Sequence, residues 1–194
     1  MQYTEGQIGR IFVVRIDDGE DLLVSLRRFI LDKGIEAGSI VFLGALMEGK
    51  MVTGPEKPVI PPDPHYVFFE GGWEVFGVGT IYMGEGGPYI HCHASVGRAG
   101  HALTGCLRER AVTYLIVEVV IYEITGLSAR REFDKKTQLH LPVLKDTSVK
   151  DMGQVTLTGD GIEPGSPGEG NTGGSELPGG LAEIIRDLTR KPPV

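Results

Sequence analysis

The residues from Ala111 to Thr125 (AVTYLIVEVVIYEIT) constrain the fold more than any other segment. They are dense in Val, Ile and Tyr, the residue types that favour β-strands. Only Glu118 and Glu123 interrupt the apolar pattern of the second half. We therefore predict a central strand of a β-sheet here, apolar enough to seek burial on both faces.

Shorter patterns predict the elements around this strand. An amphipathic helix should start near Glu20, because apolar residues recur at helical spacing until Gly34. Apolar or β-branched runs predict strands at Ile11–Ile16, Ser39–Leu46, His65–Phe69, Trp73–Tyr82 and Tyr89–Ser95, and a final edge element with a turn at Arg130–Leu141. Five prolines between Gly54 and Pro64 predict an irregular loop. Gly77 and Gly79 indicate a bend or a close backbone approach.

The chain has 194 residues, which allows one ordinary domain with an appendage. We assign residues 1–145 to that domain. Residues 146–180 are rich in Gly and Pro, and their low apolar content predicts a flexible acidic linker. In residues 181–194, Leu181, Ile184, Ile185 and Leu188 are spaced as in a short amphipathic helix.

Charge and hydropathy argue against two classes of partner. Residues 1–145 hold 15 Lys/Arg against 18 Asp/Glu, and residues 146–194 hold 4 against 8, for a net charge of −7. Nucleic-acid binders usually present clustered basic residues, and no long basic run occurs here. No segment approaches the ~20 apolar residues of a membrane helix, so we expect no membrane partner and a cytoplasmic location.

A His-x-His segment is the strongest candidate for chemistry. In a strand, His91 and His93 share one face and Cys92 takes the other, with the two histidine α-carbons about 6.5–7 Å apart. Two imidazoles at this spacing can bind one metal ion, and Cys106 or His101 could supply a third ligand. Zinc suits this mixture of ligands best.

Structural roles compete with this interpretation. Both histidines could instead be hydrogen-bonded core residues, and Cys106 could be a small buried hydrophobe. We expect Cys92 in the core and His101 in an exposed loop. Glu74 and Glu118, on or near strands, are accessory candidates for an acid or base, although surface exposure or a salt bridge explains most such carboxylates. The sequence has no P-loop and no G-x-S-x-G motif, and no G-x-G-x-x-G motif follows a predicted strand.

Together, several segments resemble the PPC domain, the plants and prokaryotes conserved domain. The resemblance runs from about Arg10 to Leu141. It rests on Gly19-Glu20-Asp21-Leu22, Gly44-Ala45, Glu74-Val75-Phe76, Gly79-Thr80-Ile81, Pro88 to Ala94 (PYIHCHA), Leu103-Thr104-Gly105-Cys106-Leu107 and Glu118-Val119-Val120-Ile121. It implies an α+β fold with an antiparallel-rich mixed sheet, a few packed helices and assembly as a homotrimer.

The resemblance also bears on the metal and on DNA. Some prokaryotic members hold zinc through the His-x-His pair and a third histidine in a Gly-Gly-His segment. Here Thr104-Gly105-Cys106 takes that place, which makes Cys106 the expected third ligand with His91 and His93. Plant members bind DNA through AT-hooks, Arg-Gly-Arg-Pro segments that this sequence lacks.

Three functions remain open from the sequence. The first is a non-catalytic regulatory or interaction protein with a bound metal, associated with DNA or with protein partners. The second is a small zinc-dependent enzyme that uses the His-x-His site, with Glu74 or Glu118 as acid or base. The third is a nucleoid-type DNA binder, which requires scattered arginines to converge on one surface after folding and trimerisation, namely Arg98, Arg108, Arg110, Arg130 and Arg131.

Overall fold

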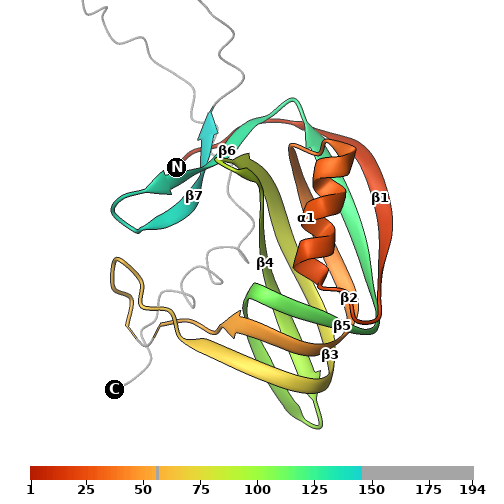
Figure 1. Cartoon of the computed structure of the whole chain (residues 1–194). Helices are drawn as coiled ribbons and strands as arrows, with labels where there is room; N and C mark the ends of the chain where they lie inside the picture. Colours follow the sequence, from red (N-terminus) through yellow and green to blue (C-terminus); the bar gives the residue numbers. More distant parts are fainter. Residues whose placement is uncertain (56, 146–194) are drawn as a thin grey trace, which may run out of the picture. The chain divides into compact units, whose positions relative to one another are not determined.

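The computed structural model describes residues 1–55 and 57–145, which form a strongly curved antiparallel sheet with one helix against it (Figure 1). The predicted linker and C-terminal helix at residues 146–194 lie outside the described residues. The strands are β1 (Gln7–Asp17), β2 (Ala37–Val52), β3 (Tyr66–Gly84), β4 (Gly87–Arg98), β5 (His101–Thr125), β6 (Ser128–Asp134) and β7 (Leu139–Lys145), and the helix is α1 (Leu22–Lys33).

The helix α1 is held at both ends by local chemistry. The Asp21 carboxylate caps its N-terminus by accepting hydrogen bonds of 3.0 Å from the backbone N–H groups of Leu23 and Val24. Gly34 ends it in the left-handed conformation, with φ of 62°. Leu22, Leu26 and Ile30 are fully buried, so the predicted amphipathic helix is confirmed. It is also the one helix of the described residues, where the sequence led us to expect a few.

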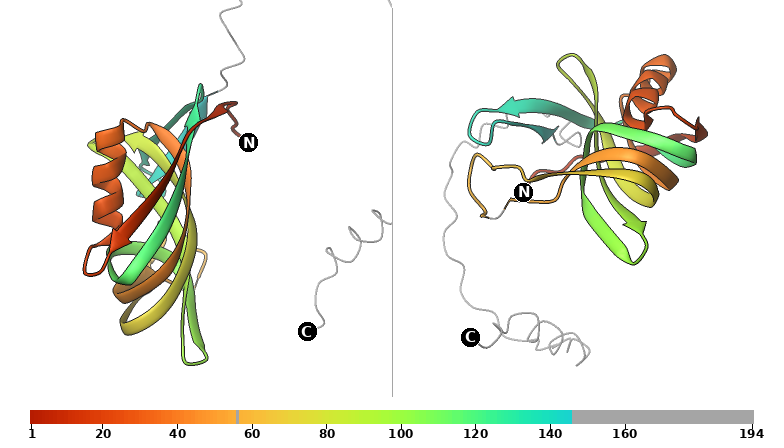
Figure 2. Two further views of the ribbon diagram at one scale, coloured as in Figure 1. Left: turned by 90° about the vertical axis from the view of Figure 1, so that its right-hand side faces the viewer. Right: turned by 60° about the horizontal axis from the view of Figure 1, so that its bottom comes forward.

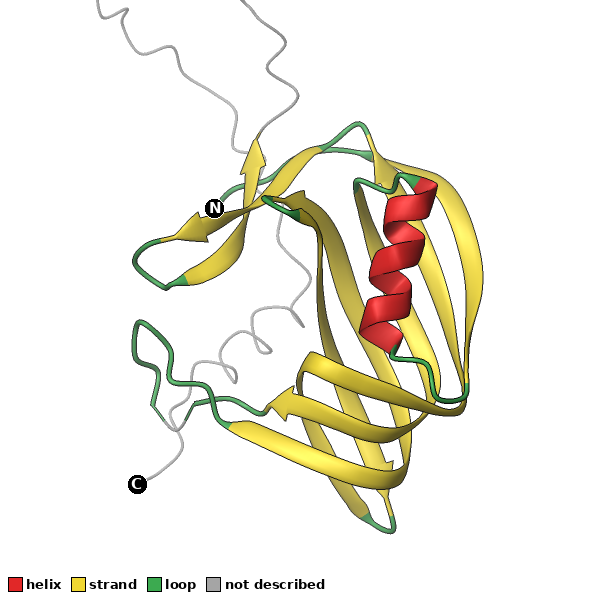
Figure 3. Ribbon diagram, viewed as in Figure 1, coloured by secondary structure: helices red, strands yellow, loops and turns green. Residues whose placement is uncertain are grey.

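The sheet runs in the order β1-β5-β2-β3-β6-β7. β4 pairs with both β3 and β5, and β5 also pairs with β2, so β2, β3, β4 and β5 close a barrel-like ring. Neighbouring strands are antiparallel except β3 and β6. The β6–β7 hairpin projects from the body of the sheet (Figure 3).

Several strands are longer than the sequence patterns predicted. The strands predicted at His65–Phe69 and Trp73–Tyr82 belong, apart from His65, to the single strand β3, which passes through Gly71 at a φ of 97°. The central strand β5 begins ten residues before Ala111, at His101, and left-handed backbone at Glu109 and Leu115 bends it. β7 continues through Pro142 because it pairs only with β6, and a sheet edge tolerates proline.

The core lies between α1 and one face of the sheet. On β5, Val117, Val119 and Ile121 alternate with more exposed residues and pack in the same cluster as Leu26 and Ile30 of α1. The turned view in Figure 2 shows the helix on one side of the curved strands. No helix among the described residues is long and apolar enough to cross a membrane.

Two glycines of β3 let β3 and β4 approach closely where they pair in the ring. A Cβ on Gly77 would overlap the Phe42 ring and lie 2.7 Å from the His93 carbonyl oxygen. A Cβ on Gly79 would lie 2.7 Å from the Cys92 Cβ and 2.8 Å from the His91 carbonyl oxygen. The close backbone approach indicated by the sequence is therefore confirmed, and it occurs beside the His-x-His segment.

Candidate metal centre

Strand register brings two histidines and a cysteine together. His91 and His93 lie on one face of β4, while Cys92 is 1% exposed on the core face. His93 is the direct register partner of Cys106 on β5, so these two side chains share a face of the sheet. The candidate donor atoms of His91, His93 and Cys106 all lie within 4.8 Å of one another.

The three donors fit a zinc ion. The ligand atoms of a tetrahedral zinc ion, with bonds of about 2.0–2.3 Å, are about 3.5 Å apart, so small side-chain rotations would bring all three donors onto one ion. The imidazole rings are 5.2 Å apart and perpendicular, and so are not stacked. Two imidazoles with one thiolate are a ligand set that zinc accepts.

Burial favours the coordinating form of His91 but opposes that of Cys106. Burial lowers the pKa of His91 to about 4, and the positive charges of Arg131 and Arg108 act in the same direction. The His91 imidazole is therefore neutral at pH 7, as coordination requires. Burial raises the pKa of the Cys106 thiol, so Cys106 must lose a proton when a metal binds.

The accessory candidates lie away from these three residues. His101 is the exposed first residue of β5, rather than a loop residue, and pairs with Arg98, five positions along β4 from His93. Glu74 is opposite Gly97 and lines a separate depression with His101. Glu118 is exposed and pairs with Arg15 and Leu43. None of the three belongs to the His91, His93 and Cys106 group.

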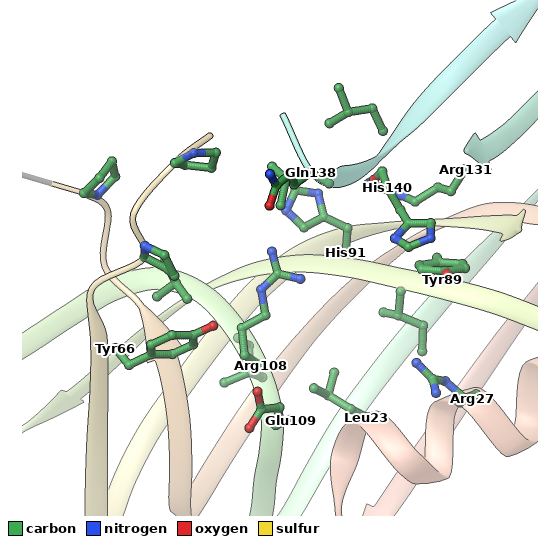
Figure 4. Close-up of a pocket in the computed structure, with 18 of the residues that line it drawn as sticks. Leu23, Arg27, Tyr66, Tyr89, His91, Arg108, Glu109, Arg131, Gln138 and His140 are labelled. Atoms are coloured by element: carbon green, nitrogen blue, oxygen red, sulfur yellow. Dashed lines mark hydrogen bonds between the residues drawn. The ribbon is translucent and has the colours of Figure 1, made fainter. Parts of the chain in front are cut away.

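A cavity of about 870 Å³ adjoins the candidate metal centre, with His91 in its wall (Figure 4). It lies between α1, the β6–β7 hairpin and the proline-rich loop, and Arg108 and Arg131 also line it. Tyr89 contributes a ring that is 4.8 Å from the His140 ring. The sequence interpretation did not identify this cavity, although the i, i+2 spacing of Cys106 and Arg108 on one strand was a signal that they share a face.

The arginines do not form one continuous basic surface. Arg110 forms an ion pair with Glu48, and the Arg98 guanidinium donates a 3.1 Å hydrogen bond to the Glu70 carbonyl. Arg98 lines the depression near His101, whereas Arg108 and Arg131 line the larger cavity. Arg130 is exposed on β6 and lines neither. The five arginines therefore do not converge within a single chain, whereas the nucleoid-type interpretation requires them to converge after folding and trimerisation.

The chain is similar to known proteins over its described part. Residues 3–125 match the sequence profile of the Plants and Prokaryotes Conserved domain, abbreviated PCC or PPC. A metal-containing protein from Archaeoglobus fulgidus is 25% identical, with a TM-score of 0.66 over 74% of this chain and 99% of that chain. A plant- and prokaryote-conserved protein from Pyrococcus horikoshii is 26% identical, with a TM-score of 0.64 over 73% of this chain and 96% of that chain.

A third solved structure supports the fold alone. It is a candidate DNA-binding protein from Bacteroides thetaiotaomicron, 24% identical, with a TM-score of 0.59 over 72% of this chain and 97% of that chain. No curated protein sequence matches the chain significantly.

Proposed function

Since the chain belongs to the Plants and Prokaryotes Conserved domain family, we propose that it is a homotrimeric zinc-binding protein with a non-catalytic regulatory or interaction role. The convergence of the His91, His93 and Cys106 donor atoms within 4.8 Å carries the metal part of this proposal. The similar Archaeoglobus fulgidus protein is described as metal-containing, which supports the same assignment.

His91, His93 and the Cys106 thiolate would hold the ion. Three protein ligands leave one position of a tetrahedral zinc ion for water or a further ligand, where the ion would act as a Lewis acid. Hydrolysis would also need an acid or base at the site. Glu109 is the one carboxylate among the described residues that line the cavity, and the Lys50 ammonium binds it at 2.6 Å. Glu74 and Glu118, the carboxylates that the zinc-enzyme hypothesis uses as acid or base, do not line the cavity, which favours the non-catalytic role.

An exposed apolar face supports the homotrimer. Val13, Val120, Val41 and Val78 are successive register partners across β1, β5, β2 and β3, and His93 follows Val78 in the same row. The exposed apolar side chains on this face are Ile11, Val13, Val41, Leu43, Phe76, Val78 and Tyr122. A patch that spans four strands is typical of a protein–protein interface. In a homotrimer, which the family resemblance implies, neighbouring chains would cover this face of the sheet.

Association with DNA, if it is retained, should be weak and strongly dependent on salt. The net charge is −7, and the arginines are divided between separate depressions and ion pairs. Affinity for DNA comes largely from neutralised phosphates, so such a surface supplies little of it. A protein partner therefore suits the regulatory role better than a DNA site.

Metal analysis of the purified full-length chain, combined with its mass in solution, tests this proposal. We expect about one zinc ion per chain and a mass of three chains. The double variant His91→Ala/His93→Ala should lose the zinc, whereas His101→Ala, matched in chemistry but outside the cluster, should keep it. Stoichiometric zinc in the double variant would refute the metal site, and a monomer at micromolar concentration would refute the trimer.

A further inference from the structure

Two arginines face the cavity next to the candidate metal centre, and neither forms an ion pair with another described residue. Arg131 donates a 2.7 Å hydrogen bond from Nη1 to the His140 carbonyl oxygen, but its buried Nε has no hydrogen-bond partner in the part of the chain that the structure describes. Arg108 is exposed and makes no side-chain hydrogen bond or ion pair within residues 1–55 and 57–145. The guanidinium groups therefore retain donors that an incoming ligand can use.

The charge around these arginines is not balanced from within the described residues. Glu109, the one carboxylate among the described residues that line the cavity, is bound by Lys50, while Arg27 adds a third guanidinium to the wall. Burial and the nearby charge of Arg108 lower the pKa of Arg131, and the opposing effects come from Tyr82 and Cys106 rather than from a carboxylate. A buried guanidinium N–H group that lacks a hydrogen-bond partner is costly, and an anion in the cavity would offset that cost.

The cavity also has the size and walls of a small-molecule site. Its volume of about 870 Å³ is within the range of about 300–1,000 Å³ that such sites occupy. Leu23, Ile90 and Leu107 supply apolar surface, and the Tyr89 ring lies beside His140. An occupant should therefore combine an anionic group with a flat or apolar body.

We propose that this cavity binds a small organic phosphate, with its phosphate between Arg108 and Arg131 and its body against the apolar wall and Tyr89. A phosphate monoester offers three strong acceptor oxygens and nearly two negative charges, which suits two guanidinium groups better than a single carboxylate does. This site goes beyond the proposed zinc-binding role, because neither arginine is a metal ligand.

Calorimetric titration of the full-length chain with adenosine monophosphate, adenosine and inorganic phosphate tests the proposal. We expect adenosine monophosphate to bind more tightly than adenosine. Arg108→Gln should lower the affinity for adenosine monophosphate by at least about tenfold, since hydrogen bonds to charged groups contribute about 1.5–3 kcal/mol. Arg108 is exposed, so this variant should fold, and thermal melts would verify it. Arg130→Gln removes the same charge outside the cavity and should change affinity less than about twofold.

Three outcomes would overturn the proposal. The first is no binding of adenosine monophosphate or inorganic phosphate at millimolar concentration. The second is binding that survives Arg108→Gln but disappears in His93→Ala, because the anion would then sit on the metal; His93 does not line the cavity. The third is Arg108-dependent binding of duplex DNA without binding of the small phosphates. Retained adenosine monophosphate binding in a zinc-free His93→Ala variant would support the anion site independently of the metal.

Discussion

The contact between β3 and β4 at Gly79 determines how closely the strand that carries His91 and His93 can approach the rest of the sheet. In Gly79→Ala, the new methyl group would lie 2.7 Å from the Cys92 Cβ and 2.8 Å from the His91 carbonyl oxygen, where ordinary contacts are 3.4–4 Å. Both neighbours are held by the backbone, so neither can rotate away. The two strands must therefore separate by several tenths of an ångström.

This separation should have two measurable effects. Overpacking of a core costs about 1–3 kcal/mol of unfolding free energy, and at about 3–4 °C per kcal/mol the melting temperature of the variant should fall by roughly 3–12 °C. The shift of β4 also displaces His91 relative to Cys106. Loss of support for metal ligands typically costs about 10–100-fold in affinity, and we expect zinc affinity to fall within that range.

Thermal unfolding and competitive zinc titration of Gly79→Ala measure both effects. Gly72→Ala is the matched control on the same strand, because its Cβ would meet only the Tyr114 ring, at 3.6 Å and 3.7 Å. If Gly79→Ala melted within about 2 °C of Gly72→Ala and bound zinc equally well, the reasoning about the approach of the two strands would be refuted.

Three other properties of the chain can be tested separately. Hydrogen bonds from Arg10 lower the pKa of Glu123 from 4.5 to about 2, so this pair stabilises the fold above about pH 4.5 and loses its effect as the pH falls toward 2. In melts at a series of pH values, the melting temperature of Glu123→Gln should depend less on pH over that range than that of the unmodified chain. An unchanged slope would contradict the assignment. Leu43→Glu puts a charge on the 56% exposed apolar side chain at the proposed interface and should convert the trimer to monomers by light scattering, whereas a persisting trimer would exclude this face. Deletion of residues 146–194 should lower the melting temperature by less than about 10 °C, because the described core consists of residues between Ile16 and Ile121; a larger fall would show that the deleted residues contribute to the fold.

Local sequence patterns predicted most of the elements but not how they join. The helix followed from its apolar spacing and Gly34, and the central strand from its Val and Ile content. The lengths of β3 and β5 were missed, because the strands continue through Gly71 and through the left-handed residue Glu109, where the sequence suggests a break. Closure of the ring depends on pairings between distant strands, which local patterns do not encode.

The candidate metal centre was predictable only in part, because local patterns do not encode the pairing of distant strands. Strand alternation placed His91 and His93 on one face, and the family resemblance directed attention to Cys106 rather than His101. Only the antiparallel register of β4 and β5 brings Cys106 opposite His93. The arginine-lined cavity could not be predicted, because α1, the proline-rich loop and the β6–β7 hairpin meet there from distant parts of the sequence.

X-ray absorption spectroscopy of the zinc-loaded full-length chain tests the central assignment most directly, because it distinguishes sulfur from nitrogen ligands by bond length. We expect one sulfur at about 2.3 Å and two imidazole nitrogens at about 2.0–2.1 Å from the ion. Cys106→Ser should remove the sulfur contribution, and Cys92→Ser, a matched change on the core face, should leave it intact. A bound zinc ion without any sulfur ligand, or with a sulfur that persists in Cys106→Ser, would contradict the assignment of His91, His93 and Cys106.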